Sequence, residues 1–337
     1  MSLVQITKES RIVLKVGAAL AAVIFIIFLL FKGGIFVRDT FFPAPPPPPD
    51  EKFGKLPPIT FPQQSGETLP EFRINTVSGV LPSFPSSFRV YKLKENTGGI
   101  TSLQTAKTRM VSLGYDQNPQ ALSPSLYRWT KSSQGSLLTY DIISLNFTLN
   151  SNYLNSNPQL GSSDKEAISR TVTGFIDSLG SDKSDLDTKN APYLYYTVSN
   201  GQLSEVSPES ASVVKIYLPQ NPVDKYNIYY PTNKPSLLYF VIVSPKDPVV
   251  AEASYNHFAP DLNTFSYYPL KSANAAYDDL KNGKGAIINS TTDSIVDITD
   301  VALGYYLGNE SSKKYLMPII IFMGRNNFKA YVSAVSD

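Results

Sequence analysis

The sequence predicts an α+β fold that is tethered to a membrane by its N-terminus. Three observations lead to this prediction: an uncharged apolar run near the N-terminus, a proline-rich stretch after it, and, from about residue 71, short β-favouring runs interrupted by three helical patterns. Helices laid on one face of antiparallel sheets are the α+β arrangement. We therefore expect an N-terminal transmembrane helix, a stalk, and two α+β modules of antiparallel sheet with short helices on one face.

An apolar run between Lys15 and Lys32 is predicted to cross a membrane. It contains no charged and no strongly hydrogen-bonding side chain, and flanking apolar residues extend the anchor to residues 12–37. That length suits a hydrocarbon core of about 30 Å. The run is apolar all round, whereas a helix buried in a globular core keeps one face that tolerates polar residues. No convincing cleavage site follows it, so we interpret it as an uncleaved single-pass anchor rather than a signal peptide.

The charges around the anchor predict its orientation. More cations precede the apolar run than follow it, and the side with more Lys and Arg stays in the cytoplasm. Residues 1–11 should therefore be cytoplasmic and the rest of the chain extracytoplasmic, which places the protein in a cell membrane. The cations before the run are Lys8, Arg11 and Lys15, and those after it are Lys32 and Arg38.

The stretch after the anchor is predicted to be a stiff spacer. Residues 43–62 hold nine of the 26 prolines, and residues 45–49 are five consecutive prolines. Such a run favours the polyproline II helix, which rises about 3.1 Å per residue and is stiff over several residues. We assign residues 38–65 to a stalk. Docking to a proline-binding module is the alternative, but such modules are mostly cytoplasmic, on the other side of the membrane.

The first predicted α+β module covers residues 66–188 and contains two helices. Residues 102–113 carry apolar side chains at helical spacing and stop before Gly114. A second helix begins near Ser163 or Asp164, where Glu166 is available for capping, and stops at Gly180. Strand patterns occupy residues 73–80, 87–93, 126–131 and, as one long alternating run, 137–149.

The second predicted module covers residues 189–337 and repeats this theme. Each module holds a helix followed by an antiparallel meander, which indicates a structural duplication without clear sequence repetition. The predicted strands are 193–198, 213–218, 237–243, 249–255 and 264–270, then a helix over 272–281, and then strands over 295–307, 316–322 and 328–335.

The C-terminal part of the chain resembles the end of the YycH/YycI proteins. The residues that carry the resemblance are Ala276-x-x-x-Leu280-x-x-Gly283, Leu303-Gly-Tyr-Tyr306, Tyr315-Leu-Met-Pro318-Ile, Phe322 and Ala330-Tyr-Val-x-Ala334. Those proteins are single-pass extracytoplasmic regulators of a cell-envelope histidine kinase, built from PepSY-like α+β modules. Residues 53–62 also resemble the stalks of uncharacterised membrane-anchored proteins from small-genome bacteria. The resemblance implies an envelope location and a regulatory role.

The composition excludes several chemistries. The chain has 337 residues with no cysteine and one histidine, so disulfide scaffolds, thiolate metal sites, cysteine nucleophiles and multi-histidine metal sites have no residues to build them. A net charge of +2, from 30 cations and 28 anions, is too small for a basic nucleic-acid surface. We predict no cofactor, no bound metal and no nucleic-acid partner.

No catalytic constellation stands out among the acid and base residues. A Ser/His/Asp hydrolase must use His257 as its base, yet no Gly-x-Ser-x-Gly elbow presents a nucleophile. We interpret His257 as a surface or half-buried residue at a strand end, and the acidic pairs as solvated charge. The nominal carboxylates for a glycosidase or a calcium loop are Asp278 with Asp279, Asp297 with Asp300, and Asp182 with Asp185 and Asp187.

Tyrosines are the remaining signal for function. A tyrosine ring packs on apolar surface while its hydroxyl stays hydrated, which is why tyrosine is frequent at binding surfaces. Neighbouring residues of a strand point to opposite faces of a sheet, so about half of these residues should belong to the core. The candidate interaction surface consists of Tyr193, Tyr195, Tyr229, Tyr230, Tyr267, Tyr305 and Tyr306.

These features lead to three hypotheses for function. The leading one is a non-enzymatic, membrane-anchored extracytoplasmic protein that acts by protein–protein interaction and regulates a membrane or envelope partner. The second is a module that binds cell-wall glycan, suggested by the tyrosines and by a content of charged residues of only 17%. The third, an envelope hydrolase, would depend on His257.

Overall fold

The computed structural model describes residues 23–28, 32, 47–62, 69–94, 103–132, 135–156, 158–159, 161, 164–308 and 314–336. The chain divides into residues 1–47 and a compact unit of residues 48–337. Of the predicted anchor over residues 12–37, only 23–28 and 32 are described, as helix, so that prediction lies outside the described residues. No helix in the described part of the chain has both the length and the apolar character needed to cross a membrane.

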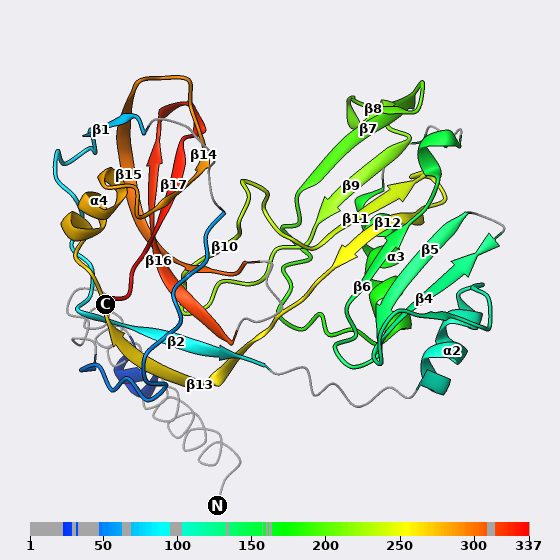
Figure 1. Cartoon of the computed structure of the whole chain (residues 1–337), viewed down its shortest axis with the longest axis horizontal. Helices are drawn as coiled ribbons and strands as arrows, with labels where there is room; N and C mark the ends of the chain where they lie inside the picture. The colour runs from blue at the N-terminus through cyan, green and yellow to red at the C-terminus, as the bar shows by residue number, and fades with distance from the viewer. Residues whose placement is uncertain are drawn as a thin grey trace, which may run out of the picture. The chain divides into compact units, whose positions relative to one another are not determined.

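Residues 48–337 form an α+β fold, as predicted (Figure 1). In the described residues, the strands make two sheets, and the α-helices are short. The two sheets do not divide the chain at residue 189. One sheet takes its strands from residues 120–255, and the other combines strands from residues 71–93 and 260–333 with the short strand at residues 228–229. The division into two modules stays a prediction.

The first sheet has nine described strands and is antiparallel throughout. Their order is β3-β4-β5-β6-β12-β11-β9-β7-β8. Strand β3 is Gln120–Ala121, β4 Leu126–Lys131, β5 Ser136–Asp141, β6 Phe147–Asn150, β7 Tyr193–Ser199, β8 Gln202–Glu205, β9 Val213–Tyr217, β11 Tyr239–Val243 and β12 Val249–Tyr255.

The single long strand predicted over residues 137–149 is wrong, because the chain turns back in the middle of it. One carboxylate oxygen of Asp141 accepts hydrogen bonds from the backbone N–H groups of Ile143 and Ser144, at 2.9 and 2.8 Å. Such a bond from an aspartate side chain to the following backbone closes a turn. The result is the hairpin of β5 and β6, which pair from Leu137 opposite Asn150 to Tyr140 opposite Phe147.

Two helices pack on one face of this sheet. Helix α2 (Leu103–Ser112) and helix α3 (Lys165–Leu179) share a core with the sheet, and Figure 1 shows α3 crossing behind the central strands. The side chain of Asp164 accepts a hydrogen bond from the backbone N–H of Glu166 and caps α3. Gly180 ends the helix in the left-handed conformation at φ 72°, which glycine adopts without a steric penalty. The observed bounds of both helices confirm their predicted positions.

The second sheet has eight described strands and is mixed. Strands β1 and β10 run parallel to β15, which corrects the prediction of purely antiparallel sheets. Both reach β15 over long connections, so no tight hairpin imposes the antiparallel direction. The strands are β1 (Glu71–Ile74), β2 (Ser87–Leu93), β10 (Ile228–Tyr229), β13 (Pro260–Pro269), β14 (Ala286–Asn289), β15 (Ile295–Tyr306), β16 (Tyr315–Gly324) and β17 (Lys329–Ser333).

Each face of the second sheet is covered by a different part of the chain. Helix α4 (Ala273–Lys281) contributes Ala276 and Leu280 to the core on one face. The other face carries a smaller cluster around Ile319 and Ile321, and Ile59 and Phe61 pack against it. A segment predicted to belong to the stalk therefore supplies the second layer of this sheet. We call residues 50–61 the strap.

The strap is held to the sheet by hydrogen bonds as well as by apolar contacts. The carboxylate of Asp50 accepts hydrogen bonds from the hydroxyl of Ser266 and, at 2.9 Å, from the backbone N–H of Tyr267. The hydroxyl of Tyr268 donates to the backbone carbonyl of Gly54 at 2.8 Å. Hydrogen bonds from Lys52 and Ser266 lower the pKa of the Asp50 carboxyl to about 2. Packed structure therefore begins at Asp50, inside the segment predicted to be the stalk.

The glycine in the Leu303-Gly-Tyr-Tyr306 motif makes room for an aromatic ring. A Cβ atom at Gly304 would lie 2.4 Å from Cε2 and 2.7 Å from Cδ2 of Tyr229. We expect Gly304→Ala to lower the free energy of unfolding by about 1–3 kcal/mol through overpacking. Urea unfolding monitored by circular dichroism measures the change.

Gly174 provides the matched control for this substitution. It lies inside α3 and has open space around a new Cβ, so Gly174→Ala should be neutral or stabilising by up to about 1 kcal/mol. Adding Tyr229→Ala to Gly304→Ala should remove the specific clash. Equal stability of the Gly304→Ala and wild-type proteins would contradict the steric explanation.

Candidate functional site

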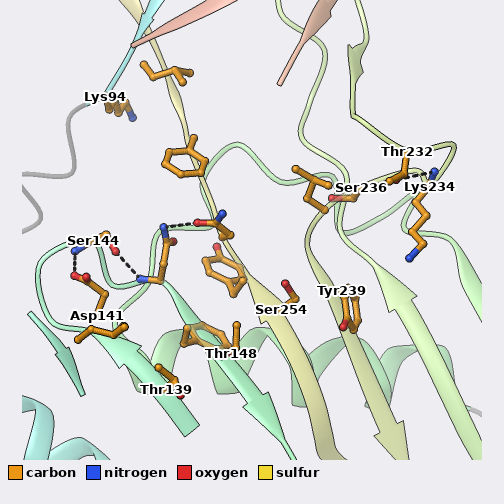
Figure 2. Close-up of a pocket in the computed structure, with 18 of the residues that line it drawn as sticks. Lys94, Thr139, Asp141, Ser144, Thr148, Thr232, Lys234, Ser236, Tyr239 and Ser254 are labelled. Atoms are coloured by element: carbon orange, nitrogen blue, oxygen red, sulfur yellow. Dashed lines mark hydrogen bonds between the residues drawn. The ribbon is translucent and has the colours of Figure 1, made fainter. Parts of the chain in front are cut away.

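A large cleft lies beside the face of the nine-stranded sheet that the helices leave uncovered. Its volume is about 1160 Å³, and its walls come from β5, β6, β11 and β12, the loop before β11, the end of β2 and the start of β16 (Figure 2). Ligand sites in proteins usually measure about 300–1,000 Å³. The cleft is therefore large enough for an extended or oligomeric ligand.

A line of hydroxyl groups crosses the sheet wall of the cleft. Successive strands pair Thr139 with Thr148, Thr148 with Ser254, and Ser254 with Tyr239. Paired residues point to the same face, and neighbouring strands lie about 4.8 Å apart, so the four side chains form a row about 14 Å long. Figure 2 shows them following one another across the strands. We call these four residues the hydroxyl row.

The hydroxyl row stands on interior strands. Each of β5, β6, β12 and β11 has a paired strand on both sides, and the edges of the sheet are β3 and β8. The residues that alternate with the row, such as Leu138, Ala253 and Phe240, are buried against the helices. The row is thus fixed by a packed core beneath it, and at each of its four positions the strand is paired with a neighbour on both sides.

Four lysines give the cleft a positive charge. Lys92 and Lys94 come from β2 and its end, Lys234 from the loop before β11, and Lys314 from the residue before β16; all four are exposed. None of them forms an ion pair with a residue that the structure describes. We call them the cleft lysines.

Little negative charge offsets these lysines among the described residues. Asp141 is the one carboxylate in the described lining, and its oxygens accept bonds from the backbone of the β5–β6 turn and from the hydroxyl of Ser125. Asp261 lies outside the lining. The hydrogen bond from Thr264 lowers the pKa of the Asp261 carboxyl, with smaller contributions from the charges of Lys94 and Lys92. Glu252, also outside the lining, accepts hydrogen bonds from the hydroxyls of Tyr153 and Tyr239. The described lining itself, with four lysines and one carboxylate, has a net positive charge.

A buried polar network connects the two sheets next to the cleft. His257, with 6% of its side chain exposed, donates from Nε2 to Oδ1 of Asp185 at 2.7 Å, because an ionised carboxylate only accepts. The amide of Gln220 donates to Oδ2 of Asp185 at 2.8 Å and to the carbonyl of Phe258 at 3.0 Å. Asn146, which lines the cleft, accepts a bond from the backbone N–H of His257. This network fixes the loop between β12 and β13.

The placement of His257 corrects one prediction and bears on catalysis. The residue follows the end of β12, as expected, but it is buried rather than at the surface, because Asp185 and Asn146 satisfy its polar groups. In a hydrolase triad, Nε2 faces the nucleophile and Nδ1 faces the aspartate. Here Nε2 is bonded to Asp185, so the pair has the geometry of a structural contact.

The other nominal carboxylates are engaged separately. Asp278 pairs with Lys281 at 2.8 Å, whereas Asp279 pairs with Lys271 at 2.8 Å and Lys284 at 3.2 Å. Within the described residues, no group of three His, Asp or Glu side chains is arranged to hold a metal ion. The remaining carboxylates also face different partners: Asp182 bonds to Ser184, Asp187 to Asn190, Asp297 to Asn75, and Asp300 to Val301.

The structure separates the candidate tyrosines into two groups. Tyr230, Tyr305 and Tyr306 are buried, with at most 4% of each residue exposed, and belong to the core of the second sheet. The other four are half-buried and do not form one patch, because two lie on β7 and the others on β10 and β13. They are Tyr193, Tyr195, Tyr229 and Tyr267. The tyrosines that do line the cleft are Tyr239, Tyr255 and Tyr315.

The cleft touches the strap through one aromatic pair. The ring of Tyr315, which lines the cleft, stacks on the ring of Phe53 with centroids 5.1 Å apart. Phe53 lies only three residues after Asp50, where the proline-rich run meets the sheet. A wall of the cleft is therefore in direct contact with the strap.

Comparison of this chain with protein-family models, with curated proteins and with solved structures finds no match. The site therefore has to be interpreted from its own geometry. Sequence reasoning missed the cleft because its lysines come from three distant segments of the chain. The one local signal was the alternation of hydroxyl residues with apolar residues along β5, β6 and β12.

Proposed function

We propose that this chain is a single-pass membrane-anchored protein that acts outside the membrane by noncovalent binding, with the cleft as its binding site. The observation that carries the proposal is a 1160 Å³ cleft with four lysines and one carboxylate in its described lining. A pocket that concentrates one sign of charge attracts ligands of the opposite sign. The partner is a component of the cell envelope, and its binding regulates a membrane protein, as in the YycH/YycI proteins that the C-terminal part resembles.

The strap supports the regulatory part of this proposal. The stacked pair of Phe53 and Tyr315 joins the wall of the cleft to the strap, and the strap continues through the proline-rich run toward the proposed anchor. A stiff polyproline segment transmits displacement better than a flexible linker. Occupation of the cleft can thus change how the strap packs, and with it the position of the anchor relative to a membrane partner.

The finer architecture belongs to the same proposal. We propose two PepSY-like modules, in which a helix precedes each meander: α2 before β4 to β6, and α4 before β15 to β17. Both meanders form antiparallel neighbours in their sheets, which supports this interpretation. Of the residues of the C-terminal resemblance, Leu280, Phe322 and Ala330 share the core under α4, whereas Tyr306, Ile319 and Tyr331 pack on the other face of the sheet.

Site-specific crosslinking in the cells that produce the protein tests the binding site. A photo-reactive residue in place of Thr148, an exposed member of the hydroxyl row, should form an adduct with an envelope component. Thr130, exposed on β4 outside the described lining, is the matched control and should form none. Deletion of residues 12–37 should release the protein from the membrane fraction and abolish the adduct. Equal adducts at both positions, or none at Thr148, would exclude the cleft as the binding site.

A further inference from the structure

We infer that the occupant of the cleft is an acidic glycan, a chain of sugars that carry carboxylate, sulfate or phosphate groups. This inference rests on the proposed function of the cleft as a binding site. It follows from three properties considered together: the cleft lysines, the hydroxyl row, and the position of that row on interior strands. Each property excludes some classes of ligand.

The cleft lysines require a ligand with several negative charges. Lys92, Lys94, Lys234 and Lys314 come from three separate segments and line a cleft more than large enough for one sugar ring. Ammonium groups bind carboxylate, sulfate and phosphate as point charges with three donors each, without the fixed fork of arginine. A polymer that repeats its charge at intervals matches such a set better than a single small anion.

The hydroxyl row requires a ligand with many hydrogen-bonding groups. Each Ser or Thr hydroxyl both donates and accepts, as does each hydroxyl of a sugar. The hydroxyl of Tyr239 donates to Oε1 of Glu252 at 2.8 Å and so offers a ligand an acceptor. The row repeats about every 4.8 Å along the sheet, close to the length of a pyranose ring. Asn256 adds an amide group at one end of it, held by a hydrogen bond from Asn146, whereas Phe258 and Tyr315 offer rings for the apolar face of a sugar.

An acidic peptide matches the charge of the cleft lysines but not the sheet that carries the hydroxyl row. Extended peptides that bind to sheets pair with a free edge strand, through their main-chain hydrogen bonds. The strands beneath the cleft, β5, β6, β12 and β11, all have partners on both sides. A membrane surface is also disfavoured, because the row offers hydroxyl groups where a lipid chain needs apolar contact. An acidic glycan can bind to the cleft lysines through its charges and to the hydroxyl row through its hydroxyl groups.

The test uses the full chain in neutral lipid nanodiscs and oligosaccharides of known charge. A hexamer of uronic acid should bind with a dissociation constant at least 10-fold lower than that of a neutral glucose hexamer, measured by calorimetry. Its affinity should fall with rising salt, because the interaction is with exposed charges. A hexamer of glutamate with an acetylated N-terminus and an amidated C-terminus, which carries the same number of carboxylates, should bind at least 10-fold more weakly than the uronic acid hexamer.

Substitutions distinguish binding in the cleft from nonspecific attraction to positive charge elsewhere on the protein. The triple variant Lys92→Gln/Lys94→Gln/Lys234→Gln should weaken binding of the uronic acid hexamer at least 10-fold. Its matched control is Lys55→Gln/Lys189→Gln/Lys246→Gln, which removes three exposed lysines outside the described lining and should change affinity less than twofold. Thr148→Phe, which fills the row, should also abolish binding, whereas Thr130→Phe should not.

The outcomes distinguish this inference from the proposed function. Three results would overturn the inference that the occupant is an acidic glycan. They are tighter binding of the glutamate hexamer than of the uronic acid hexamer, equal binding of the neutral and uronic acid hexamers, and equal losses of affinity in both triple variants. The proposed function would survive each of these results if Thr148 still forms its specific adduct in cells. Absence of that adduct would remove the proposed function together with the inference. Unchanged thermal unfolding midpoints of all variants establish that they are folded.

Discussion

A protein that begins at residue 63 should be less stable than one that begins at residue 48, by on the order of 4 kcal/mol. Removal of the strap takes away Phe53, Ile59 and Phe61, which are half-buried, and uncovers Tyr306, of which only 4% is exposed. Full burial of one large apolar side chain is worth about 1.5–3 kcal/mol, so several half-buried ones together give this magnitude. A domain is stable by only about 5–15 kcal/mol, which makes the loss large. Urea unfolding of both proteins measures it.

Point substitutions within residues 48–337 provide the controls for the strap. Phe61→Ala, which removes an edge-on contact with the ring of Tyr306 at 5.1 Å, should account for part of the loss. Lys55→Ala, at an exposed position of the strap, should leave stability unchanged. If the proteins that begin at residues 48 and 63 unfold at the same urea concentration, the strap does not stabilise the sheet, and the whole of residues 38–65 acts as a spacer.

We expect His257→Ala to lower the free energy of unfolding by about 3 kcal/mol at neutral pH. The substitution leaves Asp185 with one side-chain partner, Gln220, although only 23% of the Asp185 side chain is exposed. A hydrogen bond to a charged group contributes about 1.5–3 kcal/mol, and an unsatisfied buried carboxylate costs more. His257→Gln should lose less than half as much, because its amide can still donate to Asp185. Equal losses in the two variants would mean that packing of the ring, not the hydrogen bond, is responsible.

The same network should make stability depend on acid pH. Burial alone raises the pKa of the Asp185 carboxyl, but the hydrogen bond and charge of His257 and the amide of Gln220 outweigh it, so the pKa lies below its usual 3.8. A carboxyl with a lowered pKa in the fold stabilises it above the pKa of the unfolded chain. That stabilising contribution is lost as the pH falls below about 4 and through the lowered pKa of Asp185 in the folded protein. Asp185→Asn should therefore flatten the fall in unfolding free energy below pH 4, and an unchanged slope would contradict this.

The sequence predicted the elements of this fold better than their partners. Apolar spacing placed α3 within one residue, since Asp164 and Gly180 are local signals that need no tertiary context. Alternation placed β2, β4 and β12 within their observed bounds. The same alternation could not show the turn at residues 142–146, because an apolar residue such as Ile142 fits either a strand or a buried turn. The side chain of Asp141, which closes that turn, became informative only with its contacts known.

The pairing of strands from distant segments could not be predicted from the sequence, for a physical reason. The parallel contacts of β1 and β10 with β15 depend on which edges are free after the meander has formed. Burial of the tyrosines depends on the same packing: Tyr305 and Tyr306 are adjacent in β15 and point to opposite faces, as expected, yet both are covered. Strand alternation predicts the face of a sheet, but it does not reveal whether another layer lies on that face.

By itself, then, the sequence determined the α+β class, the positions of the helices and most strands, and the absence of cysteine chemistry, because these follow from local periodicity and composition. The tertiary structure alone decided that the second half of the predicted stalk is a strap, that His257 is buried with Asp185, and that four lysines share one cleft with a row of hydroxyls. Each of these depends on residues more than 50 positions apart in the chain, and their proximity is set by the packing of whole sheets.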